Sequence, residues 1–139
     1  MPIKKQEFYE GAALYRLART GRIAGVRYEP PFFVLNDSLL VLLKYSTRSR
    51  SPWAFTFTTD EQQILSKRAT TSKTIIGLIC GADGVAAFPF DSYIAVAPPR
   101  QSAIHIACYR RHGKHYEVAG PDGSLDGKIA PSTWLKILE

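Results

Sequence analysis

Residues 30–46, PPFFVLNDSLLVLLKYS, place two apolar runs on either side of a short polar segment. The polar segment Asn36-Asp37-Ser38 indicates a tight turn, because Asn and Asp side chains bond their own backbone and tolerate positive φ. The second run, residues 39–46, has the length of a strand and is interrupted by Lys44. Such a run predicts a central strand that is covered on both faces.

Helix and strand patterns continue on both sides of this stretch. Leu14, Leu17 and Ala18 fall on one stripe at helical spacing, so we expect a helix over residues 6–20. The remaining patterns predict, in order, strands 23–28 and 53–58, a capping-box helix from 58–62 to about 68, strands 73–80, 85–88, 103–110 and 115–119, a short strand near 127–130, and a closing helical turn from Pro131 or Ser132. We therefore expect a single domain over residues 1–139 with an α/β (α+β) fold, in which helices flank a mixed sheet and the C-terminal portion is mainly antiparallel.

The composition is that of an ordinary globular domain with an excess of positive charge. Of 139 residues, 18 are Lys or Arg and 12 are Asp or Glu, which gives a formal charge of +6. This balance favours polyanionic partners, and ordinary solvated charge is the alternative. We find no signal peptide and no apolar run long enough for a membrane span, and therefore expect a cytoplasmic protein with no membrane partner. The two isolated cysteines, Cys80 and Cys108, fit a reducing compartment and predict neither a disulfide framework nor a Cys-rich zinc site.

Several familiar catalytic motifs are missing from the sequence. It contains no G-x-S-x-G, P-loop, GxGxxG or H-E-x-x-H, so the usual acyl hydrolysis, nucleotide phosphate binding, dinucleotide redox chemistry and zinc proteolysis have no support. His105, Cys108, His112 and His115 lie close together in sequence. His105 and Cys108 are three residues apart, however, and would face opposite sides of a strand, so we predict no metal site there.

The order helix, strand hairpin, strand, helix, strand is the core order of the PD-(D/E)XK nuclease superfamily, and residues 30–46 resemble its archaeal Holliday-junction resolvase branch. The resemblance covers about residues 6–90 and implies a nuclease-like mixed sheet flanked by helices. It also implies an acid that opens the first hairpin strand, an acid-x-Lys motif in the second, and a glutamate from the first helix. In that family two carboxylates hold Mg²⁺ while the lysine positions the attacking water.

This sequence departs from the family pattern at the hairpin. Glu10, or less well Glu7, matches the helix glutamate, but the hairpin positions fall on Pro31, Lys44 and Ser46. None of these three residues has the side chain that the family uses at that position. The resemblance therefore implies a degenerate active-site motif.

A shifted register is the alternative alignment. It makes Asp37 the first acid and Leu42-Leu43-Lys44 the second motif, which keeps the lysine but lacks the second carboxylate. A metal-dependent endonuclease with migrated catalytic residues would then use Glu10, Asp37 and Lys44, with Mg²⁺ as its cofactor. Asp37 is equally well explained by the turn in which it lies.

Our first hypothesis is a nucleic-acid-associated binding module on a degenerate nuclease-like fold, with DNA or RNA as partner and no cofactor. Its phosphate contacts would come from Lys44, Arg48, Arg50, Arg110, Arg111 and Lys114. Tyr109, Tyr116 and Trp53 are candidates for stacking on unpaired bases. The migrated-site endonuclease is the second hypothesis, and a protein-interaction subunit with incidental charge is the third. We also allow for a homodimer.

One local prediction bears on the first two hypotheses. A lysine within an apolar strand is costly to bury without a partner. We therefore expect Lys44 to direct its ammonium group into a concave polar site near Glu10. The alternative is a lysine at the end of the strand that extends to solvent.

Overall fold

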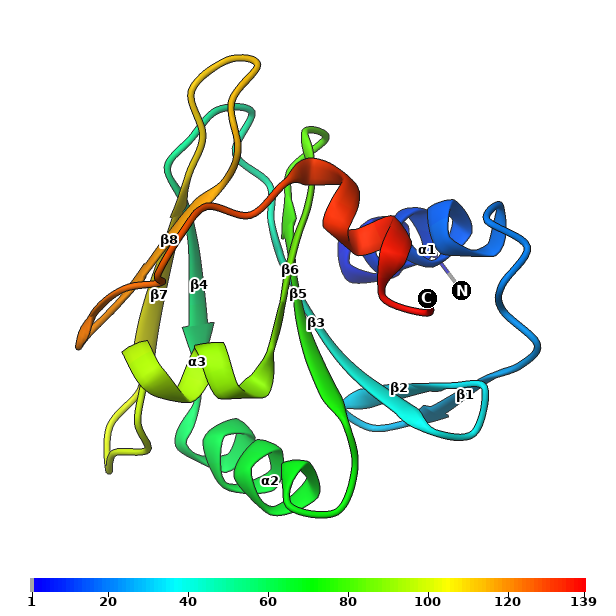
Figure 1. The fold of residues 1–139 in the computed structure, drawn as a ribbon, viewed down its shortest axis with the longest axis horizontal. Helices are drawn as coiled ribbons and strands as arrows, with labels where there is room; N and C mark the ends of the chain where they lie inside the picture. Colours follow the sequence, from blue (N-terminus) through cyan, green and yellow to red (C-terminus); the bar gives the residue numbers. More distant parts are fainter. Residues whose placement is uncertain (1) are drawn as a thin grey trace.

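The computed structural model describes residues 2–139, and these residues form two β-sheets with helices around them (Figure 1). The first sheet has the order β1-β2-β3-β5-β6, formed by β1 (Val26–Glu29), β2 (Phe32–Leu35), β3 (Leu39–Ser46), β5 (Thr74–Cys80) and β6 (Gly84–Pro89). Its central pair, β3 and β5, is parallel, and the other pairs are antiparallel. The second sheet is antiparallel throughout and consists of β4 (Trp53–Phe57), β7 (Ile104–Tyr109), β8 (Glu117–Gly120) and β9 (Gly123–Ser124). The expected α+β fold with a mixed sheet and an antiparallel C-terminal portion is thus confirmed.

Helices lie on both faces of the first sheet. Helix α1 (Lys5–Ala18) and the 3₁₀ helix η1 (Pro131–Lys136) lie on one side of it, whereas α2 (Thr59–Ala69), α3 (Phe90–Val96) and the second sheet lie on the other (Figure 1). No helix in the described part of the chain is long and apolar enough to cross a membrane.

The two hydrophobic clusters lie on opposite faces of the first sheet, and β3 contributes side chains to both. Side chains alternate across a strand, so Val41 and Leu43 join α1 and Trp134 in one cluster, while Leu40 and Leu42 face the second sheet in the other. All five residues from Leu39 to Leu43 are buried. The alternation then places Lys44 on the side of α2 and Tyr45 on the side of α1.

Most local signals in the sequence correspond to the elements that form. Asn36 and Asp37 have φ values of 52° and 59°, as expected for the predicted tight turn. The Thr58 side chain accepts a hydrogen bond from the Glu61 N–H, and the Glu61 carboxylate accepts one from the Thr58 N–H, so the predicted capping box is confirmed. Helix α1 matches the predicted helix to within two residues at each end.

One predicted strand does not form, and one helix that was not predicted does. Residues 127–130 form no strand, because only Ile129 makes an isolated bridge, to Tyr116; the short strand is β9, earlier in the chain. Helix α3 was not predicted, because its seven residues follow β6 directly and are too few to establish a helical period.

Candidate functional site

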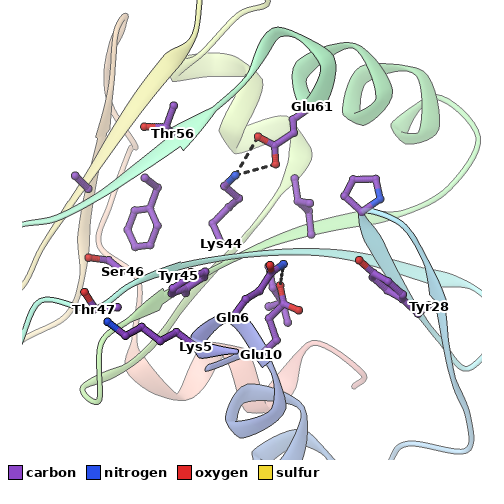
Figure 2. Close-up of a pocket in the computed structure, with 15 residues that line it drawn as sticks. Lys5, Gln6, Glu10, Tyr28, Lys44, Tyr45, Ser46, Thr47, Thr56 and Glu61 are labelled. Carbon is purple, nitrogen blue, oxygen red and sulfur yellow. Dashed lines mark hydrogen bonds and ion pairs between the residues drawn. The ribbon is translucent and has the colours of Figure 1, made fainter. Parts of the chain in front are cut away.

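An open pocket of about 770 Å³ lies where β3 runs past the end of β2. Of the residues of β3, only 39–42 pair with β2, so residues 43–46 of β3 extend beyond the end of β2. The pocket takes its walls from α1, β3, β4 and α2, and Tyr28 of β1 and Pro31 complete its lining (Figure 2). Its polar and charged lining consists of Lys5, Gln6, Glu10, Lys44, Ser46, Thr47, Thr56 and Glu61.

Lys44 and Glu61 form an ion pair at this pocket. The Lys44 Nζ donates to both carboxylate oxygens of Glu61, at 3.0 and 2.8 Å, and the two side chains are only 19% and 22% exposed. Burial raises the pKa of Glu61, but hydrogen bonds from Lys44 and the Thr58 N–H outweigh it and hold the pKa below its ordinary value. Lys44 therefore has a carboxylate partner, as an almost buried lysine requires, but the partner is Glu61 of α2 rather than Glu10.

Glu10 lines the same pocket from helix α1. Its Oε2 accepts a hydrogen bond from Gln6 Nε2 at 3.0 Å. Partial burial raises the pKa of Glu10, although the Gln6 hydrogen bond and the positive charge of Lys44 act in the opposite direction. The pocket therefore contains two carboxyl groups in different electrostatic environments, one ion-paired and one partly desolvated.

Two exposed tyrosines also line the pocket. Tyr45 is 36% exposed and stacks on Tyr9, with ring centroids 5.4 Å apart and an interplanar angle of 14°. Tyr28 is 55% exposed and lies 5.0 Å from the Phe33 ring. Each ring is thus supported by a second ring. The sequence did not single out these tyrosines, because alternation on a strand does not show where a sheet edge is left open.

Two basic segments distant in sequence meet at the end of the sheets beyond the pocket (Figure 1). One is the loop 47–52 and the other is the β7–β8 connection, residues 110–116; together they are called the basic loops below. The Ser51 hydroxyl joins them by donating to the Arg110 carbonyl oxygen at 3.1 Å. Four of the predicted phosphate ligands are exposed here and make no salt bridge within residues 2–139: Arg48, Arg50, Arg111 and Lys114.

Arg110 differs from these four residues because it is engaged in intramolecular contacts. Its guanidinium forms a 2.7 Å salt bridge with Asp83 and donates to the Lys114 carbonyl oxygen at 2.6 Å. Asp83 also accepts a hydrogen bond from the Tyr116 hydroxyl at 2.6 Å. Arg110 therefore holds the hairpin in place, and its charge is largely compensated.

The structure does not bring the migrated catalytic set together. Asp37 lies in the turn before β3, whereas Lys44 lies near the other end of that strand. The Asp37 side chain is 89% exposed, pairs with Arg27 at 2.6 Å and does not line the pocket. Asp37 therefore does not share a site with Glu10 and Lys44, because the turn places it at the opposite end of β3 from the pocket.

Other predicted residues also differ from expectation. Tyr116 and Trp53 are 0% and 2% exposed, so neither ring is accessible to a base, whereas Tyr109 is 45% exposed. Glu7 is exposed and accepts a hydrogen bond from the Lys4 N–H, away from the pocket lining. Glu7 therefore caps the N-terminus of α1.

The cysteine and histidine positions follow from the strand geometry. On β7, His105 is exposed and Cys108 is buried, so they face opposite sides. Cys108 Sγ lies 3.7 Å from Cys80 Sγ, and both thiols are free. The described residues contain no group of three or more His, Cys, Asp or Glu side chains arranged for a metal ion.

Comparisons with protein-family models, with curated proteins and with solved structures found no match. The residues of the chain itself are therefore the basis for assigning a function.

Proposed function

We propose that this protein binds DNA or RNA, mainly through phosphate contacts made by the basic loops. The observation that carries this proposal is that these loops, about 60 residues apart in sequence, lie together and expose Arg48, Arg50, Arg111 and Lys114 without carboxylate partners in the described chain. Cations that are not compensated within the protein are available to replace the counterions of a polyanion. The net charge of +6 adds long-range attraction.

Such binding would be largely independent of sequence. The cations lie on loops, and phosphate contacts carry no base information. The proposal needs no cofactor. It includes a cytoplasmic location, for which the two free thiols are the supporting observation.

The proposal also includes the resemblance to PD-(D/E)XK nucleases with a degenerate site. In support, helix α1, the β1–β2–β3 meander, helix α2 and strand β5 follow one another in the family's core order, with β4 inserted before α2. Lys44 and the helix residue Glu10 line one pocket, as the resemblance implies. Pro31 and Lys44 occupy the pocket wall where that family places its two acids, and Ser46 lies where it places the lysine.

Charge reversal on one loop tests the proposal. Fluorescence anisotropy with two unrelated labelled DNA sequences should show that Arg48→Glu/Arg50→Glu weakens binding of both by about tenfold or more, if each phosphate contact contributes roughly 1 kcal/mol. The matched control is Lys67→Glu/Lys73→Glu, which changes the charge equally at the other end of the first sheet, where β5 begins. Equal weakening by both variants, or no binding by the natural protein at low salt, would refute the proposal; the second result would favour a protein-interaction subunit with incidental charge.

A second candidate is metal-dependent phosphodiester cleavage in the pocket. The observation that favours it is that two carboxylates, Glu10 and Glu61, line the same pocket as Lys44. Carboxylate oxygens are ligands that Mg²⁺ prefers, and a bound Mg²⁺ would supply positive charge to a reacting phosphate. The fit is incomplete, because both oxygens of Glu61 already accept hydrogen bonds from Lys44.

Cleavage is tested directly with Mg²⁺ or Mn²⁺ on labelled single strands, duplexes and junctions of DNA and on RNA. We expect little or no cleavage, because Lys44 already donates hydrogen bonds to both oxygens of the Glu61 carboxylate. Metal-dependent cleavage that Glu10→Gln and Glu61→Gln abolish, in variants whose circular dichroism is unchanged, would make the nuclease the better assignment.

A further inference from the structure

We infer that the pocket between α1, β3, β4 and α2 receives an unpaired base of a single-stranded nucleic acid, stacked on Tyr28 or Tyr45. The inference rests on the proposed function and identifies the form of nucleic acid that the site takes. The observation behind the inference is that two exposed aromatic rings, each packed against a second ring, line one polar pocket together with Lys5 and Lys44.

The rings of Tyr28 and Tyr45 are held in position and are accessible to a base. Tyr9 stacks on Tyr45, and Phe33 packs beside Tyr28, so each ring is held in place while a third or more of the residue remains exposed. A ring that is already fixed loses little conformational entropy when a base stacks on it. Base–aromatic stacking contributes about 1–3 kcal/mol per base and tolerates any base, because each base has a π-face.

The location of the pocket favours an unpaired base over a paired one. A base in a duplex already stacks on both faces and is paired along one edge, so it would have to leave the helix to reach a recess. The pocket, at about 770 Å³, lies within the usual 300–1,000 Å³ range of small-molecule sites. Thr47 lines the pocket and is followed directly by Arg48, so a strand with its phosphates on the basic loop would continue into the pocket.

Gln6 and Glu10 add a hydrogen-bond acceptor to the pocket. In Figure 2, Gln6 and Glu10 lie between Tyr45 and Tyr28 and are joined by their hydrogen bond. Glu10 Oε1 accepts no hydrogen bond within the described residues. A carboxylate oxygen accepts a hydrogen bond from the exocyclic amino group of an unpaired cytosine, or from the ring N3–H of an unpaired thymine. Oligo(dC), which carries an amino group on every base, is therefore a suitable single-stranded probe for the pocket.

Three probes of equal length separate this inference from simple electrostatic binding: labelled dC15, a 15-base-pair duplex, and a 15-unit abasic phosphodiester strand. We expect Tyr28→Leu and Tyr45→Leu each to weaken dC15 binding by about 5- to 150-fold, the equivalent of 1–3 kcal/mol. Binding of the duplex and the abasic strand should be unchanged. Tyr15→Leu is the matched control, since Tyr15 is an α1 tyrosine that is 62% exposed and does not line the pocket.

Conservative variants guard against loss of structure. Tyr28→Phe and Tyr45→Phe keep the ring and should bind dC15 like the natural protein. Unchanged binding of the duplex and the abasic strand by the leucine variants would exclude a general packing defect. The inference is overturned if the leucine variants weaken the abasic strand as much as dC15, or leave dC15 binding unchanged. Failure of the proposed function is a different result, in which the natural protein binds none of the three probes at low salt.

Discussion

Replacing Lys44 by methionine removes one partner of the ion pair at the pocket and leaves the apolar stem of the side chain in place. Exposed ion pairs contribute about 0–1 kcal/mol, whereas breaking a fully buried pair costs about 3–5 kcal/mol. The Lys44 and Glu61 side chains, at 19% and 22% exposed, lie between these limits. We therefore expect Lys44→Met to lower the free energy of unfolding by about 2 kcal/mol at pH 7, after allowance for solvent screening.

The effect should depend on pH in a defined direction. The pKa of Glu61 is lowered in the folded protein, so its contribution is complete above the ordinary glutamate pKa and is lost as pH falls through the lower folded value. The cost of Lys44→Met should therefore shrink in acid, because a protonated Glu61 no longer needs a cation.

Thermal and urea unfolding measure this cost. For a chain of this size, about 2 kcal/mol corresponds to a decrease in Tm of roughly 6–10 °C. Lys67→Met, at an exposed lysine of α2, is the control and should change stability by less than about 0.5 kcal/mol. A double-mutant cycle with Glu61→Gln isolates the pairwise energy. A coupling energy near zero, or equal stability of Lys44→Met and Lys67→Met at pH 7, would show that the Lys44–Glu61 pair does not stabilise the fold.

Three further predictions concern stability and reactivity. Gly81→Ala should destabilise the protein by about 2 kcal/mol or more in urea unfolding and weaken DNA binding, because Gly81 has φ +55° and its added Cβ would collide with the Arg48 carbonyl oxygen; unchanged stability would show that loop 47–52 can yield. Tyr93→Phe should leave Tm unchanged or raise it, since the buried Tyr93 hydroxyl has no hydrogen-bond partner within residues 2–139; a clear loss of stability would reveal a missed partner. Cys80 and Cys108 should not react with a thiol reagent at pH 8 until urea unfolds the chain, because hydrogen bonding to Cys108 and burial raise the pKa of the Cys80 thiol; rapid labelling of the native protein would contradict this.

Local signals in the sequence were sufficient for most of the secondary structure. The apolar run of β3 and the Asn36-Asp37 turn are each decided by residues within a few positions of one another. The capping box of α2 is equally local. The alternation in β4 predicted a strand, but not that it would leave the first sheet and pair with β7, since that pairing joins residues about 50 positions apart.

The candidate site was predictable only in part for the same reason. An apolar strand that contains Lys44 predicts a carboxylate partner, but does not say which one. Glu61 has two roles, because its Oε1 accepts hydrogen bonds both from the Thr58 N–H and from Lys44, and only the first role is visible in the sequence. Asp37 was a reasonable candidate by spacing, but its side chain points to Arg27 and solvent.

The salt dependence of binding tests whether the exposed cations of the basic loops contact phosphates. Each contact contributes about 0.7 to the slope of log affinity against log salt for a single strand, so Arg48, Arg50, Arg111 and Lys114 predict a slope near −3. Arg48→Gln/Arg50→Gln should make that slope shallower by about 1.4, whereas Lys67→Gln/Lys73→Gln should leave it unchanged. A slope that is the same in the natural protein and in Arg48→Gln/Arg50→Gln would show that these two arginines do not contact phosphates.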